Sequence, residues 1–455
     1  MRVRDQITAI FCLCMLCISL IGVINTQAQQ RAAAGSQASG TRASAYVIRN
    51  ARIVTVSGPE IENGTLVIRD GKIEAVGASA SVSAPPGAQE IDARGLTIYP
   101  GMMDAGTSLG LVEISLGAPG TVDTAEVGEM NPNASALNAI NPHSAHVNVT
   151  RANGITSVAS LPLGGIISGQ AAIINLDGTT TPEMAVVPSA ALVINFPRAA
   201  TSNDGGYYAP PTEIPITEAL TTRDKQIERL RKFLRDAESY GKAQDAYQRD
   251  KRLPRPNQSV VLASLVPYVR GERPVIFRAE RESEIRAAVR FADEMHLKAI
   301  ILGGGEAWKA AALLKERNVP VIVTSVRDLP PLEDDYYDAL YTNPSKLQQA
   351  GVRFCISSGD TGAEVRELPY HAGMAASFGL PRDEALKAVT LYPAQIMGVA
   401  DRLGSIEVGK TANLAITDGD LLDARTHVRY LFINGRQLPL TSRHTELYEQ
   451  FKDRR

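Results

Sequence analysis

Alternating apolar and polar residues mark both ends of the chain. Within residues 46–99, the segments YVIRNARIVTV, GTLVIRDGKIEAVG and IDARGLTIYPG alternate in this way, and the pairs Asp70-Gly71 and Asn63-Gly64 are typical of tight turns. The same pattern returns within residues 404–440, in ANLAITDGD and VRYLFINGRQLPL. We therefore predict small antiparallel strands at both ends, forming one composite β-sandwich domain with the middle of the chain inserted.

Apolar runs followed by helical patterns fill residues 100–403. PVIFRA precedes ESEIRAAVRFADEMH, LKAIILGG precedes EAWKAAALLKERN, VPVIVTS follows, and VRFCISSGD precedes EVRELPYHAGMAASFGL. Repeated strand-then-helix units indicate an α/β fold with a parallel sheet covered by helices. We expect a (β/α)8 TIM-like barrel with its chemistry at the C-terminal ends of the strands. A doubly wound open sheet is the alternative, without a glycine fingerprint for nucleotide binding. Residues 223–252 predict a solvated helix.

The first 28 residues are typical of an export signal. Arg2 and Arg4 precede an apolar stretch over residues 7–24, and Thr26-Gln27-Ala28 offers a small-residue cleavage site. Residues 29–45 predict a flexible tether, because Ala, Ser, Gly and Gln dominate them. An uncleaved membrane anchor is the alternative, since the apolar run approaches the length that spans a bilayer. We expect a periplasmic or secreted protein whose residues 441–455 form a C-terminal tail.

The composition of the chain is that of a globular protein and gives no support to nucleic-acid binding. The 455 residues are 44% hydrophobic and 21% charged, which is ordinary for a globular protein. Lys and Arg number 47 against 49 Asp and Glu, so no basic excess favours nucleic acid as a partner. Cys355 is alone outside the predicted signal segment, and its apolar neighbours predict a buried structural thiol. The expected partner is a small-molecule substrate or ligand.

The order of the end motifs resembles the amidohydrolase superfamily. RNARIVTV, DGKIEAVG and IDARGLTIYPGMMDA precede the predicted barrel, and TLYPAQIMGVADRLGSIEVGKTANLAITDGD and FINGR follow it. Over residues 46–440 this order is similar to the imidazolonepropionase-like branch. The resemblance implies a (β/α)8 barrel with a β domain from both chain ends, one or two divalent metals, and hydrolysis of non-peptide C–N bonds, often in cyclic amides. It also leads us to expect a homodimer.

The metal-ligand positions of that family are mostly substituted in this sequence. Two histidines spaced by two on a strand face the same side and can hold one ion. The family places such a pair at the end of the first barrel strand, single histidines on the fifth and sixth strands, and an aspartate on the eighth. The aligned residues are Gly106 and Ser108 for the pair, Arg278 for the fifth strand, Gly303 and Gly304 for the sixth, and Asp360 for the eighth.

These substitutions change the expected chemistry. One carboxylate cannot hold a catalytic zinc, which needs three protein ligands, and arginine has no lone pair to donate. We therefore predict no family metal site; zinc or another divalent metal is expected only if other ligands replace the lost ones. In our hypothesis Arg278 fills the vacated space and pairs with Asp360 or Glu280, or orients an anionic substrate group. Asp360 is the candidate base of a hydrolase; the alternative is a catalytically inactive binding protein with this fold.

Three further candidates are weaker. His371 follows Asp360 in a helical pattern and is either a proton carrier near the barrel mouth or a packing residue. His143 and His146 have the i, i+3 spacing of one helix face, although Ser144 indicates an ordinary helix start. The glycine-rich residues 161–178 favour a hairpin with tight turns over an anion-binding loop.

Overall fold

The computed structural model describes residues 45–115, 118–203, 210–324, 326–330 and 335–454, which belong to one compact unit of residues 41–455. The predicted signal segment lies outside the described residues, as does all of the predicted tether except Ala45. Within the described ranges, no helix combines the length and apolar character needed to cross a membrane.

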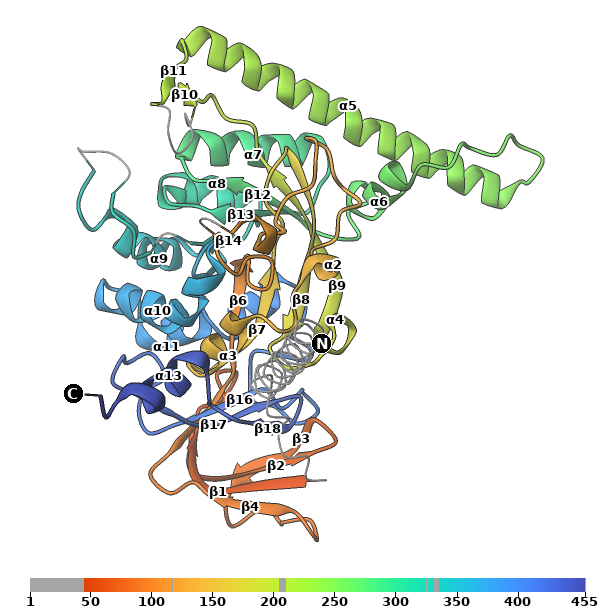
Figure 1. The fold of residues 1–455 in the computed structure, drawn as a ribbon. Helices are drawn as coiled ribbons and strands as arrows, with labels where there is room; N and C mark the ends of the chain where they lie inside the picture. The colour runs from red at the N-terminus through yellow and green to blue at the C-terminus, as the bar shows by residue number, and fades with distance from the viewer. Residues whose placement is uncertain (1–44, 116–117, 204–209, 325, 331–334, 455) are drawn as a thin grey trace, which may run out of the picture. The chain divides into compact units, whose positions relative to one another are not determined.

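Strands from both chain ends form one sheet (Figure 1), as the alternating pattern predicts. The strand order is β18-β17-β16-β5-β1-β2-β3, with β4 paired to β1, and β5 joins the two ends by pairing antiparallel with β16. The prediction of antiparallel pairing is wrong for β4 and β5, which both run parallel to β1. The strands are β1 (Ala45–Ile53), β2 (Ile61–Arg69), β3 (Lys72–Ala78), β4 (Gln89–Asp92), β5 (Thr97–Pro100), β16 (Leu414–Thr417), β17 (Val428–Ile433) and β18 (Arg436–Leu438).

Of the two turns predicted for this sheet, the structure contains one. Asp70 and Gly71 connect β2 to β3 with φ angles of 50° and 81°, which confirms the first turn. Asn63-Gly64 instead lies inside β2. A Cβ at Gly64 would lie 2.4 Å from Ile53 Cδ1, so this glycine permits a close approach between β1 and β2 rather than a change of direction.

A nearly closed eight-stranded barrel follows, which confirms the TIM-like prediction. The strand order is β6-β7-β8-β9-β12-β13-β14-β15, and seven of these strands are parallel. β8 runs antiparallel to β7 and β9, because only residues 161–166 connect β7 to β8 and a parallel crossover needs a longer link. This confirms the hairpin predicted for the glycine-rich segment. The barrel strands are β6 (Met102–Thr107), β7 (Ile155–Ser160), β8 (Ile167–Asn175), β9 (Ala185–Asn195), β12 (Val275–Ala279), β13 (Ala299–Gly303), β14 (Val321–Val323) and β15 (Phe354–Ile356).

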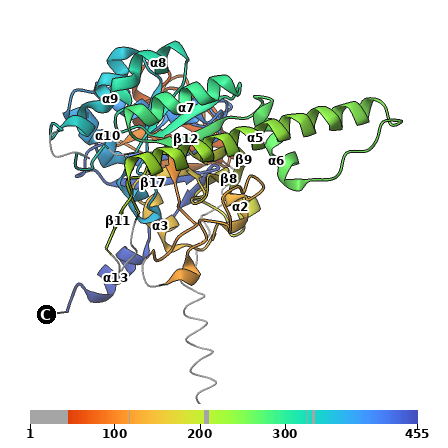
Figure 2. The same cartoon turned by 90° about the horizontal axis from the view of Figure 1, so that it is seen from above.

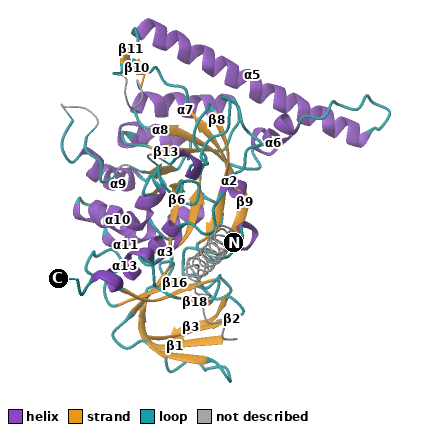
Figure 3. Ribbon diagram, in the orientation of Figure 1, coloured by secondary structure: helices purple, strands orange, loops and turns teal. Residues whose placement is uncertain are grey.

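Helices cover the outside of the barrel (Figure 3). The predicted solvated helix is α5, which Figure 2 shows running past α6 away from the barrel; buried Leu230 and Leu234 hold its middle against the core. The helices are α2 (Ala136–Ala139), α3 (Ala145–Arg151), α4 (Thr181–Met184), α5 (Ile216–Arg249), α6 (Val260–Val269), α7 (Glu282–Glu294), α8 (Ala311–Glu316), α9 (Ala339–Ala350), α10 (Leu368–Ser377), α11 (Arg382–Lys387), α12 (Leu391–Ile396) and α13 (Arg443–Phe451). Shorter elements are the 3-10 turns η1 (Pro119–Thr121), η2 (Ala307–Ala310) and η3 (Gly362–Glu367), and the strand pair β10 (Ser202–Asn203) and β11 (Thr212–Glu213).

Polar side chains join the barrel to the β domain. Asn175 at the end of β8 donates to Asn434 Oδ1 at 2.7 Å, and Asn413 donates to Asn175 Oδ1 at 2.9 Å. Close by, the carboxylate of Asp177 forms an ion pair with Arg436 in β18. The end of β8 is therefore tied to the β domain by directional hydrogen bonds and an ion pair, so the two parts are expected to unfold together.

Candidate active site

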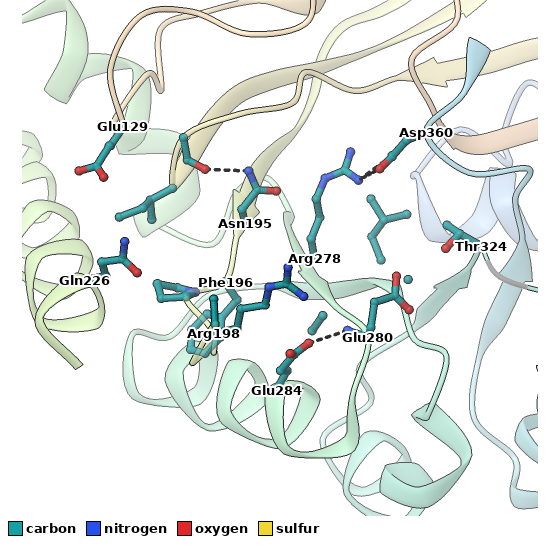
Figure 4. Close-up of a pocket in the computed structure, with 17 residues that line it drawn as sticks. Glu129, Asn195, Phe196, Arg198, Gln226, Arg278, Glu280, Glu284, Thr324 and Asp360 are labelled. Carbon is teal, nitrogen blue, oxygen red and sulfur yellow. Dashed lines mark hydrogen bonds and ion pairs between the residues drawn. The ribbon is translucent and has the colours of Figure 1, made fainter. Parts of the chain in front are cut away.

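A cavity of about 620 Å³ opens at the C-terminal ends of the barrel strands (Figure 4). This is the end at which barrels of this type carry their chemistry. Strands β9, β12 and β13 and the segments after β14 and β15 supply side chains, while the loop before α2 and the first half of α5 form the rim. The labelled residues in Figure 4 are Glu129, Asn195, Phe196, Arg198, Gln226, Arg278, Glu280, Glu284, Thr324 and Asp360.

Arg278 and Asp360 lie together in the wall of this cavity. Alternation along β12 turns Ile276 and Arg278 to the barrel interior, whereas Phe277 packs in the outer layer. Arg278 Nη1 lies 2.6 Å from Asp360 Oδ1 and 2.7 Å from Oδ2. The arginine side chain is 17% exposed and the aspartate 49%, and the buried Nε and Nη2 of Arg278 have no partner among the described residues. The structure thus contains the first of the two pairings considered for Arg278.

Apolar atoms fill the space beside Gly106 in β6. A Cβ at this position would lie 2.7 Å from Leu302 Cδ1 and 3.2 Å from Ser357 Oγ. Leu302 belongs to β13, in register with Arg278, and it lines the cavity. An imidazole at position 106 would therefore require Leu302 to move, and the cavity has an apolar floor at this point.

Glu280 occupies the space beside Gly303, the aligned position of the sixth barrel strand. A Cβ at Gly303 would lie 2.1 Å from Glu280 Oε1, and the N–H of Gly305 donates to Oε2 at 3.1 Å. Glu280 opens toward the cavity, but the surrounding barrel desolvates its carboxylate and raises its pKa to about 7. The negative charges of Glu284, Asp360 and Asp328 act in the same direction. Glu280 can therefore exchange a proton near neutrality.

Position 108 is linked to Asp360 by a hydrogen bond. The buried Ser108 donates its hydroxyl to the main-chain carbonyl of Asp360. Four residues earlier, the fully buried Asp104 accepts hydrogen bonds from Ser357 and Ser358, and its burial raises its pKa. The sequence does not predict a role for Asp104, because a single acid in an apolar strand carries no signal of its hydrogen-bond partners.

The residues at the aligned family positions do not fit a metal centre. A guanidinium faces the one retained carboxylate, a leucine methyl group fills the space at Gly106, and Glu280 fills the space at Gly303. Throughout the described part of the chain, no three His, Cys, Asp or Glu side chains are grouped closely enough to hold a metal ion.

The remaining candidates lie outside the cavity lining. His371 is buried in α10, where desolvation and the nearby Arg327 lower its pKa to about 4, so it is neutral at physiological pH and packs in the helix layer. The ring of His146 contacts the carbonyl of Glu113 at 2.9 Å. Ser144 caps α3, so His143 precedes the helix and the two histidines do not share a helix face. Cys355 is buried in β15, as predicted.

Comparisons with known proteins agree with this architecture. Residues 354–439 match the family model described as the amidohydrolase family. An imidazolonepropionase from Mesorhizobium japonicum is 26% identical over 82% of this chain and 91% of its own length. N-acetylglucosamine-6-phosphate deacetylase from Haemophilus influenzae is 39% identical, but that match covers 14% of this chain and only 17% of the enzyme. The crystal structure of an amidohydrolase from Thermotoga maritima superposes with a TM-score of 0.74 at 24% identity, covering 86% of this chain and 99% of that one.

The barrel, the cavity at its C-terminal end and the sheet built from both chain ends define a barrel protein of the amidohydrolase type. These findings support the amidohydrolase superfamily: residues 354–439 match its family model, and most of the chain is similar to an imidazolonepropionase.

Proposed function

We propose that this protein is an exported hydrolase of the amidohydrolase family that cleaves a non-peptide C–N bond in a small substrate, such as a cyclic amide. In this proposal a carboxyl group and two arginines act in the place of the family's metal. The observation that carries it is Glu280, a cavity carboxyl group with a pKa of about 7 beside the Arg278–Asp360 pair. A general base works best when its pKa lies near the operating pH.

The proposed reaction needs only groups of the cavity and one water molecule. Glu280 accepts a proton from water as the water oxygen bonds to the amide carbon, and the carbonyl electron pair moves to oxygen. The electron pair on oxygen then re-forms the carbonyl, the C–N bond breaks with its electrons moving to nitrogen, and Glu280 returns the proton to that leaving nitrogen. Asp360, the base expected from the sequence, is engaged by Arg278 instead, which leaves Glu280 free for proton transfer.

The two arginines are proposed to stabilise negative charge. Arg278, Arg198 and Glu280 line the same cavity; Figure 4 shows the Arg278 guanidinium turned toward Asp360, and no described residue forms an ion pair with Arg198. A fixed cation beside a developing oxyanion stabilises the transition state more than the ground state. Arg278 is suited to this role because Asp360 holds it in place, whereas Arg198 is suited to an anionic group of the substrate.

A second candidate function is a catalytically inactive binding protein. It is favoured by Leu302, which fills the space beside Gly106 where the family carries a metal ligand, since a superfamily fold alone does not guarantee activity. In that case the same cavity binds a small ligand without turnover.

Turnover of a panel of cyclic amides, N-acyl amino acids and dipeptides separates these functions. We expect turnover that survives a chelator, gains nothing from zinc, and falls about 100-fold or more in Glu280→Gln. Glu316→Gln, an exposed glutamate of α8, is the control and should keep wild-type activity. Activity that requires zinc and is unchanged in the Glu280→Gln variant would contradict the metal-free proposal. Saturable binding without turnover would favour the binding protein.

N-terminal sequencing of the protein from its native host tests the proposed export. We expect cleavage of the signal segment after Ala28.

A further inference from the structure

Asp104 is a buried carboxylate for which the proposed reaction has no use. Its side chain is 0% exposed. Oδ1 accepts the Gly106 N–H at 3.2 Å and the Ser357 hydroxyl, and Oδ2 accepts the Ser358 N–H at 3.1 Å and the Ser358 hydroxyl. An ionised carboxylate has about four acceptor sites, so these four donors satisfy it without a cation.

The hydrogen-bond partners of Asp104 lie across the junction that closes the barrel. β6 and β15 are the two end strands of the eight-stranded sheet, and Ser357 and Ser358 come directly after β15. The same segment continues through Gly359, whose φ is 93°, to Asp360. Directly after β6, Ser108 donates its hydroxyl to the carbonyl of Asp360. The segment that carries Asp360 is therefore held at two points, by Asp104 in β6 and by Ser108 just beyond it.

We propose that Asp104 is a positioning residue: by fixing residues 357–360 against β6, it sets the place of Asp360 and, through Asp360, of the Arg278 guanidinium in the cavity wall. The inference deepens the proposed function, because the pair it positions is the one proposed to act on the substrate. Asp104 itself does not line the cavity.

The chemistry of Asp104 is better suited to positioning than to packing alone. Removing a carboxylate from water is costly, and an apolar side chain would fill the same volume without that cost. A carboxylate has directional acceptors, however, and here each oxygen accepts from a main-chain N–H and from a serine hydroxyl. Ser357 Oγ also lies 3.0 Å from the Gly106 carbonyl and 3.4 Å from the Gly359 N–H, so one network fixes both sides of the junction.

Chemical modification of arginine tests this positioning without relying on activity. Phenylglyoxal is applied to the full folded protein, and peptide mass spectrometry follows Arg278, with Arg198 in the same cavity as internal reference. In Asp104→Ala we expect Arg278 to react about tenfold faster relative to Arg198, as the loss of a buried hydrogen-bonded contact predicts. Asp104→Asn should raise the ratio less than Asp104→Ala, because its carboxamide oxygen still accepts from one N–H and one serine hydroxyl, whereas its NH2 group faces the other two donors.

A matched control distinguishes positioning from a general loss of stability. Asn175→Ala removes another buried, hydrogen-bonded side chain of the barrel that does not line the cavity and bonds to the β domain instead, and it should leave the Arg278 ratio unchanged. If Asp104→Ala does not fold, Ser358→Ala removes one of the four donors and should raise the ratio in the same direction. An unchanged ratio in the folded Asp104 and Ser358 variants, or an equal rise in Asn175→Ala, would overturn the inference. If the wild-type protein turns over no substrate, the proposed function fails, but the modification ratios still decide the role of Asp104.

Discussion

A carboxyl group with a pKa of about 7 changes charge across the physiological range, and Glu280 is such a group at the cavity wall. Because the proposed base is the ionised form, kcat/KM should rise with pH and level off above about 7. Asp328→Asn removes a nearby negative charge that raises the pKa of Glu280, so it should move the midpoint to lower pH. The measurement is the pH profile of both proteins. An unmoved midpoint would assign the titration to another group.

Gly303 gives a second test at the scale of one residue. Its φ is 104°, and a Cβ would meet the Glu280 carboxylate at 2.1 Å. Gly303→Ala should therefore lose roughly 1–2 kcal/mol of unfolding free energy from backbone strain, and should displace Glu280 and abolish its titration near neutrality. Gly398→Ala is the control: its φ is 72° but no atom lies within 4 Å of the added Cβ, so only the strain applies. Equal activity in the two variants would contradict the account of Gly303.

Part of this site could be predicted from the sequence, and part could not. Gly106, Ser108, Arg278 and Asp360 follow from aligned motifs at strand ends. Glu280 was considered only as a partner for Arg278, because its raised pKa depends on Gly303, which is distant in sequence and leaves space for its carboxylate. Asp104 was not predicted, since its four donors come mostly from a segment more than 250 residues away.

At the scale of the elements, periodicity predicts strands and helices well but not their directions. The runs at β12, β13, β14 and β15 lie within the predicted strands. The reversed direction of β8 follows from the length of a connection, which apolar periodicity does not report. Likewise, Asn63-Gly64 has the composition of a turn but lies in a strand, because a contact with β1 decides its role.

His371 in helix α10 should make the unfolding free energy of the protein depend on pH. His371 is buried there with a pKa of about 4, below the value of about 6.5 expected in the unfolded chain. The folded state thus disfavours the charged imidazole, and stability is lost as pH falls from about 6.5 toward 4. Between pH 7 and about pH 4.5, the wild-type protein should lose about 2–3 kcal/mol more than His371→Gln. Urea unfolding of both proteins at the two pH values measures this difference. An equal loss of unfolding free energy in the wild-type protein and in His371→Gln would show that folding does not lower the pKa of His371.

At the scale of the whole molecule, the β domain and the barrel share polar contacts that stabilise both. The carboxylate of Asp177, 8% exposed, lies after β8 and pairs with Arg436 in β18, and the Asn175–Asn434 bond lies nearby. Breaking a largely buried pair leaves an uncompensated charge. Because Arg436 is about one third exposed, the expected cost of Asp177→Ala is about 2–3 kcal/mol, below that of a fully buried pair.

The form of the unfolding curve tests whether the two parts are one cooperative unit. At Asp177 the end of barrel strand β8 meets β18, which belongs to the sheet built from both chain ends, so Asp177→Ala should lower the midpoint of a single transition rather than split it into two. Asp236→Ala, which removes an exposed pair with Lys232 on α5, should change the unfolding free energy by less than about 0.5 kcal/mol. Denaturant unfolding followed by circular dichroism and by the fluorescence of Trp308 compares the two variants. Separate transitions in the Asp177 variant would mean that the β domain folds on its own, and that the contacts from β18 do not couple it to the barrel.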